Sequence, residues 1–81
     1  MLELPDGAIK WDGFDECIIG VGSRCGFEDV LCYDINKMIE LLEFRDGMSY
    51  EEAVEYLEYN VIGAYVGKQT PVIITPILGE I

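Results

Sequence analysis

Carboxylates are the side chains of this protein that could most readily do chemistry, because they outnumber every other functional group. Sixteen Asp and Glu stand against five Lys and Arg, which gives a formal net charge of -11. Paired carboxylates can bind Mg²⁺ or Ca²⁺, or serve as general acid and base. The closest group, Asp12, Asp15 and Glu16 in DGFDE, lacks the length and alternation of an EF-hand loop. We therefore expect turn and capping roles for these acids, and no metal site.

The candidate nucleophiles have no base to activate them. The chain has two serines, Ser23 and Ser49, and three cysteines, Cys17, Cys25 and Cys32, but it has no His. Neither a Ser-His nor a Cys-His pair can be assembled, so we expect no catalytic residue and no cofactor. The odd number and the spacing of the cysteines do not fit a zinc site. They predict free thiols, which are typical of a reducing cytoplasm.

The glycine-rich stretch GVGSRCG at 20–26 is the one segment that resembles a phosphate-binding loop. Its spacing is that of neither a dinucleotide loop nor a P-loop, and no strand of the required type precedes it. Packing of a helix against another backbone explains Gly20 and Gly22 more simply.

The net charge limits the partners that the chain can have. A charge of -11 repels nucleic-acid phosphates and anionic lipids, so we expect neither direct nucleic-acid binding nor a membrane partner. It attracts a basic protein surface, although charge that only keeps an apolar domain soluble is an equal alternative. No run approaches the ~20 apolar residues of a membrane span, and the N-terminus lacks a basic leader. A cytoplasmic location is predicted.

Turn residues and apolar runs predict one α+β domain over residues 1–81, with the order ββαβααβ and a short sheet packed against three helices. The PDG turn at 5–7 predicts an N-terminal hairpin with strands at 2–4 and 8–11. Acids at the start of 14–26 and Arg24 near its end favour a first helix there, because this charge order suits a helix dipole.

The second half of the chain carries stronger signals. VLCYD at 30–34 predicts a strand, and Asp34 is placed to cap a second helix that stops at Gly47. The Ser49-x-x-Glu52 capping box predicts a third helix that continues to Gly67. PVIITPI at 71–77 predicts a last strand, which its prolines confine to an edge or to strand ends.

Helical periodicity separates a core face of the third helix from a possible interaction surface. The core face holds apolar residues with one amide at its border, namely Tyr50, Ala53, Val54, Leu57, Val61, Ala64, Tyr65 and Asn60. Glu51, Glu55 and Glu58 share an adjoining flank without a cation nearby on the helix, which is either a solvated face or an electrostatic docking edge.

Apolar residues outside these core faces suggest a second neighbour. Tyr59, Ile62 and Val66 lie opposite the core face of the third helix. Phe44 points away from the core stripe of the second helix, which consists of Ile35, Met38, Ile39 and Leu42. A sheet, a second copy or a target protein could cover them, and we favour a homodimer. The predicted partner-binding residues are accordingly Glu51, Glu55, Glu58, Tyr59, Ile62 and Phe44.

A small-molecule pocket at a subunit interface is the alternative site. It would draw on Asn60, Tyr65, Lys68 and Arg24, and it is motivated by the amide of Asn60 near a core border. A bond from Asn60 to nearby backbone is the simpler interpretation of that amide.

Several short motifs together resemble a group of small uncharacterised phage and bacterial proteins. The motifs are Tyr33-Asp34, Arg45 to Ser49, Glu51 to Ala53, Asn60, Gly63 to Gly67 and Thr70-Pro71, and they span most of the chain. The resemblance implies a small phage-type accessory protein and supplies no activity.

Three hypotheses follow for the function. The first is an acidic interaction protein, such as a phage-encoded inhibitor, that binds a basic surface of a nucleic-acid-binding or defence protein of the host. The second is a homo-oligomer that sequesters a small molecule or nucleotide. The third is an enzyme that uses carboxylate-bound metal.

Overall fold

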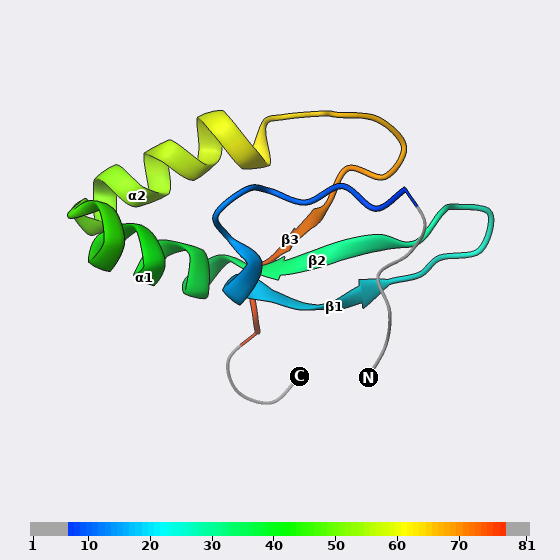
Figure 1. Ribbon diagram of the computed structural model, residues 1–81, viewed down its shortest axis with the longest axis horizontal. Helices are drawn as coiled ribbons and strands as arrows, with labels where there is room; N and C mark the ends of the chain where they lie inside the picture. Colours follow the sequence, from blue (N-terminus) through cyan, green and yellow to red (C-terminus); the bar gives the residue numbers. More distant parts are fainter. Residues whose placement is uncertain (1–6, 78–81) are drawn as a thin grey trace.

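The computed structural model describes residues 7–77 as a small α+β fold in which two helices lie beside one end of a three-stranded mixed sheet (Figure 1). The chain runs through these elements in the order η1 (Asp15–Cys17, a 3-10 helix), β1 (Ile18–Gly22), β2 (Val30–Asp34), α1 (Ile35–Asp46), α2 (Tyr50–Leu57), η2 (Glu58–Ile62, a π-helix) and β3 (Val72–Ile74).

The central strand of the sheet is β2, with β1 antiparallel on one side and β3 parallel on the other. A parallel pair requires a crossover, and here the segment with α1, α2 and η2 supplies it. The ladder shifts between Ile18 and Gly20, so that Ile19 has no partner on β2. The short β3 is an edge strand, as the prolines around it predict.

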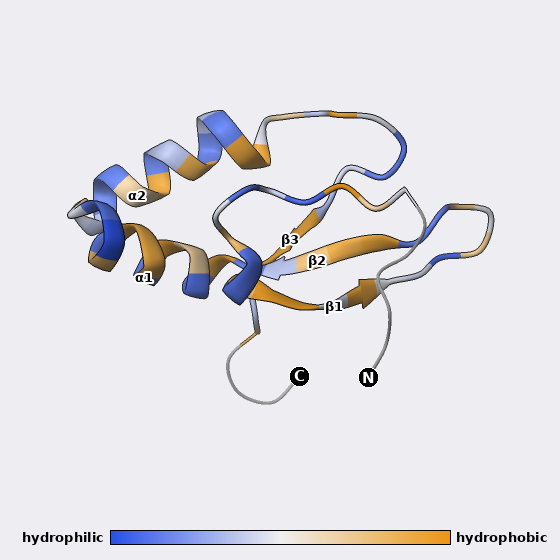
Figure 2. Cartoon of the chain, viewed as in Figure 1, coloured by the Kyte–Doolittle hydropathy of each residue, from blue (hydrophilic) through white to orange (hydrophobic). Residues whose placement is uncertain are grey.

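The two faces of the sheet have different surroundings. Leu31 and Tyr33 are fully buried among helix residues, together with Met38, Leu42 and Leu57. Successive strand residues face opposite sides, so Cys32 points to the other face, and it is buried outside this core cluster. Apolar residues follow the strands and recur on one side of each helix, which Figure 2 shows as orange segments.

Tyr33 joins the N-terminal segment to this core. Its hydroxyl accepts a hydrogen bond from the backbone N–H of Trp11 at 2.9 Å, and its side chain has no exposed surface. Burial raises the pKa of the Tyr33 hydroxyl, which the Trp11 bond partly opposes. The hydroxyl therefore stays neutral and serves as a structural acceptor.

Helix α1 begins and ends where the sequence predicts. The Asp34 carboxylate accepts from the backbone N–H groups of Asn36 at 2.8 Å and Lys37 at 3.3 Å. Gly47 ends the helix in the left-handed region with φ of 67°. Of the predicted core stripe, Met38, Ile39 and Leu42 are buried, and Ile35 is partly buried against the core.

The capping box of α2 is present in both directions. Ser49 Oγ accepts from the Glu52 backbone N–H at 3.2 Å, while a Glu52 carboxylate oxygen accepts from the Ser49 N–H at 3.0 Å. These bonds lower the pKa of the Glu52 carboxyl below its ordinary value of 4.5. Glu52 is therefore ionised, and its charge is used to start the helix.

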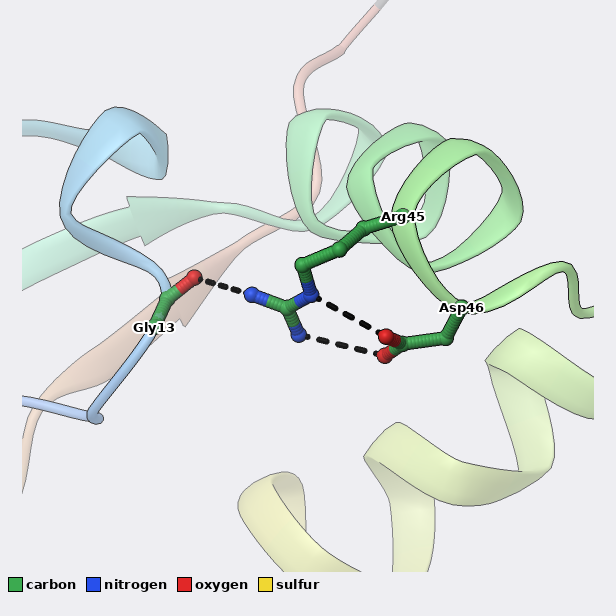
Figure 3. A network of polar contacts seen from close by, with 3 residues as sticks. All are labelled: Gly13, Arg45 and Asp46. Atoms are coloured by element: carbon green, nitrogen blue, oxygen red, sulfur yellow. Dashed lines mark hydrogen bonds and ion pairs between the residues drawn. The ribbon is translucent and has the colours of Figure 1, made fainter.

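Arg45 ties the end of α1 to the loop before η1, as Figure 3 shows. Its Nη1 donates to the Gly13 carbonyl oxygen at 2.7 Å, and its Nε and Nη2 donate to the Asp46 carboxylate at 3.2 Å each. Gly13 has φ of 85°, a conformation that favours glycine, and the turn brings its carbonyl to Arg45. The adjoining Phe14 ring lies 5.4 Å from the guanidinium carbon.

The predicted helix over 14–26 is wrong. Only Asp15–Cys17 forms a helical turn, and Ile18–Gly22 is the strand β1. Ile18, Ile19 and Val21 are β-branched, and each glycine costs a helix about 1 kcal/mol relative to Ala. Pairing with β2 therefore outweighs the charge order that favoured a helix.

Two further expectations need correction. Residues 8–11 form no strand, and the predicted strand at 2–4 lies outside the described residues. The third helix ends at Ile62 rather than near Gly67, and its last turn is a π-turn that the Gly63 N–H closes on the Glu58 carbonyl at 3.0 Å. A Cβ at Gly63 would lie 2.9 Å from that carbonyl oxygen, so glycine suits the close approach. The described order is therefore ββααβ with two α-helices, in place of ββαβααβ with three.

Replacing Ser49 with Ala should lower the free energy of unfolding by about 1 kcal/mol, because the Glu52 N–H loses its cap. Urea denaturation followed by circular dichroism would measure the change. The matched control is Ser23→Ala in the exposed β1–β2 loop, which should change stability by less than about 0.5 kcal/mol. Equal losses in both variants would contradict the role given to the cap.

Candidate functional site

The acidic face, defined by Glu51, Glu55 and Glu58, runs along α2 into η2. All three side chains are exposed, as predicted, and residues 50–62 contain four glutamates and no Lys or Arg. Glu51 lies in the first turn, where the helix dipole stabilises negative charge, but Glu55 and Glu58 lie beyond its reach. Within the described part of the chain, none of the three carboxylates forms an ion pair.

A hollow of about 280 Å³, here called the α2 hollow, borders this face. It brings together Glu55, Tyr59 and Asn60 from the predicted sites with three residues that were not predicted there, Met48, Glu52 and Tyr56. Glu52, Tyr56 and Tyr59 are spaced four and three residues apart, so a helical projection could have shown that they share one side of the helix. The α2 hollow combines carboxylates with aromatic surface.

The polar groups in the α2 hollow differ in their freedom to bind. Asn60 Nδ2 donates to the Tyr56 carbonyl oxygen at 3.0 Å, so its amide bonds nearby backbone as the simpler interpretation predicted. Glu52 is used by the capping box. The Glu55 carboxylate makes no hydrogen bond or ion pair with described residues, and it is therefore the carboxylate of the hollow that is available to a partner.

Apolar side chains beside the acidic face are exposed. Tyr59 is 78% exposed and Ile62 48% exposed. Tyr50 and Tyr65, which were predicted to belong to the core face, are also exposed at 62% and 78%. Tyr50 is the first residue of the helix, and Tyr65 follows the π-turn with which the helix ends. Neither side chain therefore lies on the buried side of the helix.

Phe44 lies on α1, away from the α2 hollow. It is 89% exposed, and it lines a different hollow of about 360 Å³ with Leu41, Lys37 and Glu40. The predicted partner-binding set is thus divided between two surfaces, one on α2 and η2 and one on α1. Spacing along a single helix could not have revealed this division.

The predicted ligand residues are also divided. Arg24 and Lys68 line one hollow of about 370 Å³ at the end of the sheet, here called the sheet hollow. Tyr65 and Lys68 line an adjoining hollow, whereas Asn60 lies on the α2 hollow. The sheet hollow includes Phe27 and Cys32, which the sequence analysis missed because it placed 14–26 in a helix rather than at the hairpin.

The titratable groups give no sign of a metal centre within residues 7–77, where no three potential Asp, Glu, Cys or His ligands are grouped. The three cysteines are unpaired, as predicted. Burial is the main cause that raises the pKa of the Cys17 and Cys32 thiols, and Glu16 adds to the effect at Cys17.

Across the described range, no helix has the length and apolar character needed to cross a membrane.

Comparison with known proteins adds no relative, since no family model, curated protein or solved structure matches the chain.

One cysteine should react with a thiol reagent much faster than the other two. Cys25 is exposed, whereas Cys17 and Cys32 are buried and their raised pKa values keep them protonated at pH 7.5. Labelling with a chromogenic disulfide at pH 7.5 should show one fast thiol, and Cys25→Ser should remove that phase. Three equal rates in the native protein would contradict the burial described for β2 and η1.

Proposed function

We propose that this protein is an acidic interaction protein that binds a basic surface of a partner through the acidic face and the α2 hollow. The observation that carries the proposal is the exposure of Glu51, Glu55 and Glu58 beside Tyr59 and Ile62 on a segment without a cation. The carboxylates would attract the partner, and the apolar side chains would supply contact area.

Solubility alone is a weaker explanation of this surface. Charge that only keeps a domain soluble has no need of exposed aromatic rings beside it, because such rings reduce solubility. Tyr56 and Tyr59 nevertheless lie next to Glu55 on the α2 hollow. Tyrosine is enriched where interfaces need both apolar area and a hydroxyl. The combination therefore favours a binding surface.

The distribution of charge on this surface also favours a basic partner. Glu55 and Glu58 gain little from the helix dipole and have no ion-pair partner among the described residues. Their mutual repulsion is a cost to the free protein that cations on a partner would relieve. A surface rich in Lys or Arg, such as one that binds nucleic acid, has the required chemistry.

The resemblance to small phage and bacterial proteins extends this proposal to a biological setting. A phage-encoded inhibitor could occupy the basic site of a host nucleic-acid-binding or defence protein by presenting carboxylates in place of phosphates. We propose that role, acting in the cytoplasm, together with a homodimer in which apolar residues such as Phe44 are covered by a second copy.

Replacing Glu51, Glu55 and Glu58 together with Gln should abolish capture of the partner from a host-cell lysate. The isosteric amides remove the charges and keep the shape, and capture by the wild-type protein should also fall steeply with added salt. Affinity capture at low and high salt, quantified by mass spectrometry, would measure both effects. Light scattering of the same samples would report whether the free protein is a dimer.

The matched control carries Asp12→Asn, Glu28→Gln and Asp29→Asn, which remove the same charge from exposed positions away from α2. This control should retain the partner, and heparin should compete with the capture because both ligands need the same cations. The proposal fails if the two triple variants lose the partner equally, or if capture is indifferent to both.

A further inference from the structure

The sheet hollow lies on the face of the sheet that the helices leave uncovered within residues 7–77. Its floor consists of strand residues, Gly22 from β1, Val30 and Cys32 from β2, and Val72 from β3. Gly22 pairs with Val30, and Cys32 pairs with Val72, so the four residues adjoin across the three strands. Apolar strand surface thus forms the base of a hollow whose rim carries charge.

Gly22 keeps the floor low. Its φ lies outside the left-handed region, so the backbone itself would accept another residue. A Cβ at this position would instead lie 2.9 Å from Cys32 Sγ and 3.7 Å from Val30 Cγ2. Close packing of the Cys32 thiol against Gly22, rather than backbone geometry, therefore accounts for glycine here.

The floor is apolar and uncharged. Burial raises the pKa of the Cys32 thiol, so at neutral pH the sulfur is protonated and behaves as a small hydrophobic group. A protonated thiol is neither a metal ligand nor a ready nucleophile. The floor is suited to the apolar body of a ligand rather than to a cation.

Two cations stand at the rim of this hollow, Arg24 and Lys68. Unlike Lys10 and Arg45, which pair with Asp15 and Asp46, neither lies within 4 Å of a carboxylate oxygen among the described residues. Glu28 is the acidic residue that also lines the hollow. In a chain of net charge -11, two cations without an ion pair to residues 7–77, beside one acid, make a local site of opposite sign.

Local contacts order the two loops that carry these cations. The guanidinium carbon of Arg24 lies 3.8 Å from the centroid of the Phe27 ring, and a turn that joins the Phe27 N–H to the Arg24 carbonyl at 3.0 Å keeps the two residues together. Next to Lys68, Thr70 Oγ1 donates to the Gly67 carbonyl at 2.6 Å and accepts from the Val66 N–H at 2.9 Å. The rim is therefore preorganised by contacts within each loop.

The available space suits a small organic molecule. The sheet hollow has about 370 Å³, and the adjoining hollow has about 550 Å³. The two share Phe27, Glu28, Lys68 and Thr70. Ligand sites for small molecules are commonly of this size and combine an apolar lining with a few polar groups.

We propose that the sheet hollow binds a small organic monoanion with an apolar ring system, whose acidic group lies between Arg24 and Lys68 and whose rings cover Gly22, Cys32 and Val72. Arg24, Lys68 and Glu28 together leave one net positive charge at the rim, which matches one negative charge on the ligand. A polyphosphate carries more negative charge than this and is disfavoured. This site is separate from the acidic face, and it makes no use of Glu51, Glu55 or Glu58.

The probe for this proposal is 8-anilinonaphthalene-1-sulfonate, a monoanion on an aromatic body, and N-phenyl-1-naphthylamine is the matched neutral compound. In ¹H–¹⁵N spectra of the ¹⁵N-labelled protein, the sulfonate should shift the amide signals of 22–32 and 68–72 most. The double variant Arg24→Gln, Lys68→Gln should weaken its binding about tenfold or more, because two charge-assisted contacts are lost. The neutral compound should lose less than about twofold.

The control Lys37→Gln removes from α1 one cation that has no ion pair within the described range, and it should leave sulfonate binding unchanged. The same spectra show whether each variant remains folded, and the single variants Arg24→Gln and Lys68→Gln replace the double variant if it does not. The proposal is overturned if the shifts centre on α1 or α2, if both compounds weaken alike, or if millimolar sulfonate shifts no signal of 22–32 or 68–72.

Discussion

The pairing of β1 and β3 with the central strand β2 is the interaction on which the rest of the structure depends. β2 has ladder partners on both sides, and three consecutive residues, Leu31, Cys32 and Tyr33, are buried. Because successive strand residues face opposite sides of the sheet, Leu31 and Tyr33 pack in the core with the helices, and Cys32 lies on the other face. The Trp11 bond to the Tyr33 hydroxyl then attaches the N-terminal segment to the same strand. One five-residue strand thus organises the core and the sheet hollow together.

The acidic face and the cations of the sheet hollow lie on different elements of the fold. The helices lie toward one end of the molecule and the β1–β2 hairpin toward the other (Figure 1). The longest dimension of the fold is 38 Å, whereas the Debye length in physiological salt is about 8 Å. The acidic face lies on α2 and η2, whereas Arg24 lies in the β1–β2 hairpin and Lys68 in the loop before β3, and salt screens exposed charges that are more than a Debye length apart. A small acidic protein can in this way present a surface for a basic partner and still hold a local site for an anion.

The elements that the sequence predicts correctly are those with local signals. The Asp34 cap, Gly47 and the Ser49 capping box each use bonds within a few residues, so their effects can be read from short motifs. Ile18–Gly22 is different, because the partner that makes it a strand is β2, which is separated from it by a loop. Local charge order favoured a helix, and tertiary pairing decided the outcome.

The candidate sites show the same limit. Exposure of Glu51, Glu55 and Glu58 follows from helical periodicity, and the structure agrees with it. The membership of the sheet hollow could not be derived in this way, since Gly22, Phe27 and Cys32 meet Lys68 only after the hairpin and the crossover have formed. Tyr65 was misplaced because the π-turn at Glu58–Ile62 ends the helix early, and the sequence gives no strong sign of that turn.

The most direct test of the account is the measurement of nuclear Overhauser contacts across the β1–β2 ladder in solution. The antiparallel pairing of β1 and β2 predicts cross-strand contacts that link Gly20 to Cys32 and Gly22 to Val30, the pairs on the face of the sheet that the helices leave uncovered. A series of contacts between residues three apart throughout 15–24, without those cross-strand contacts, would show a helix there. That result would contradict the strand pairing, and the sheet hollow would have no floor.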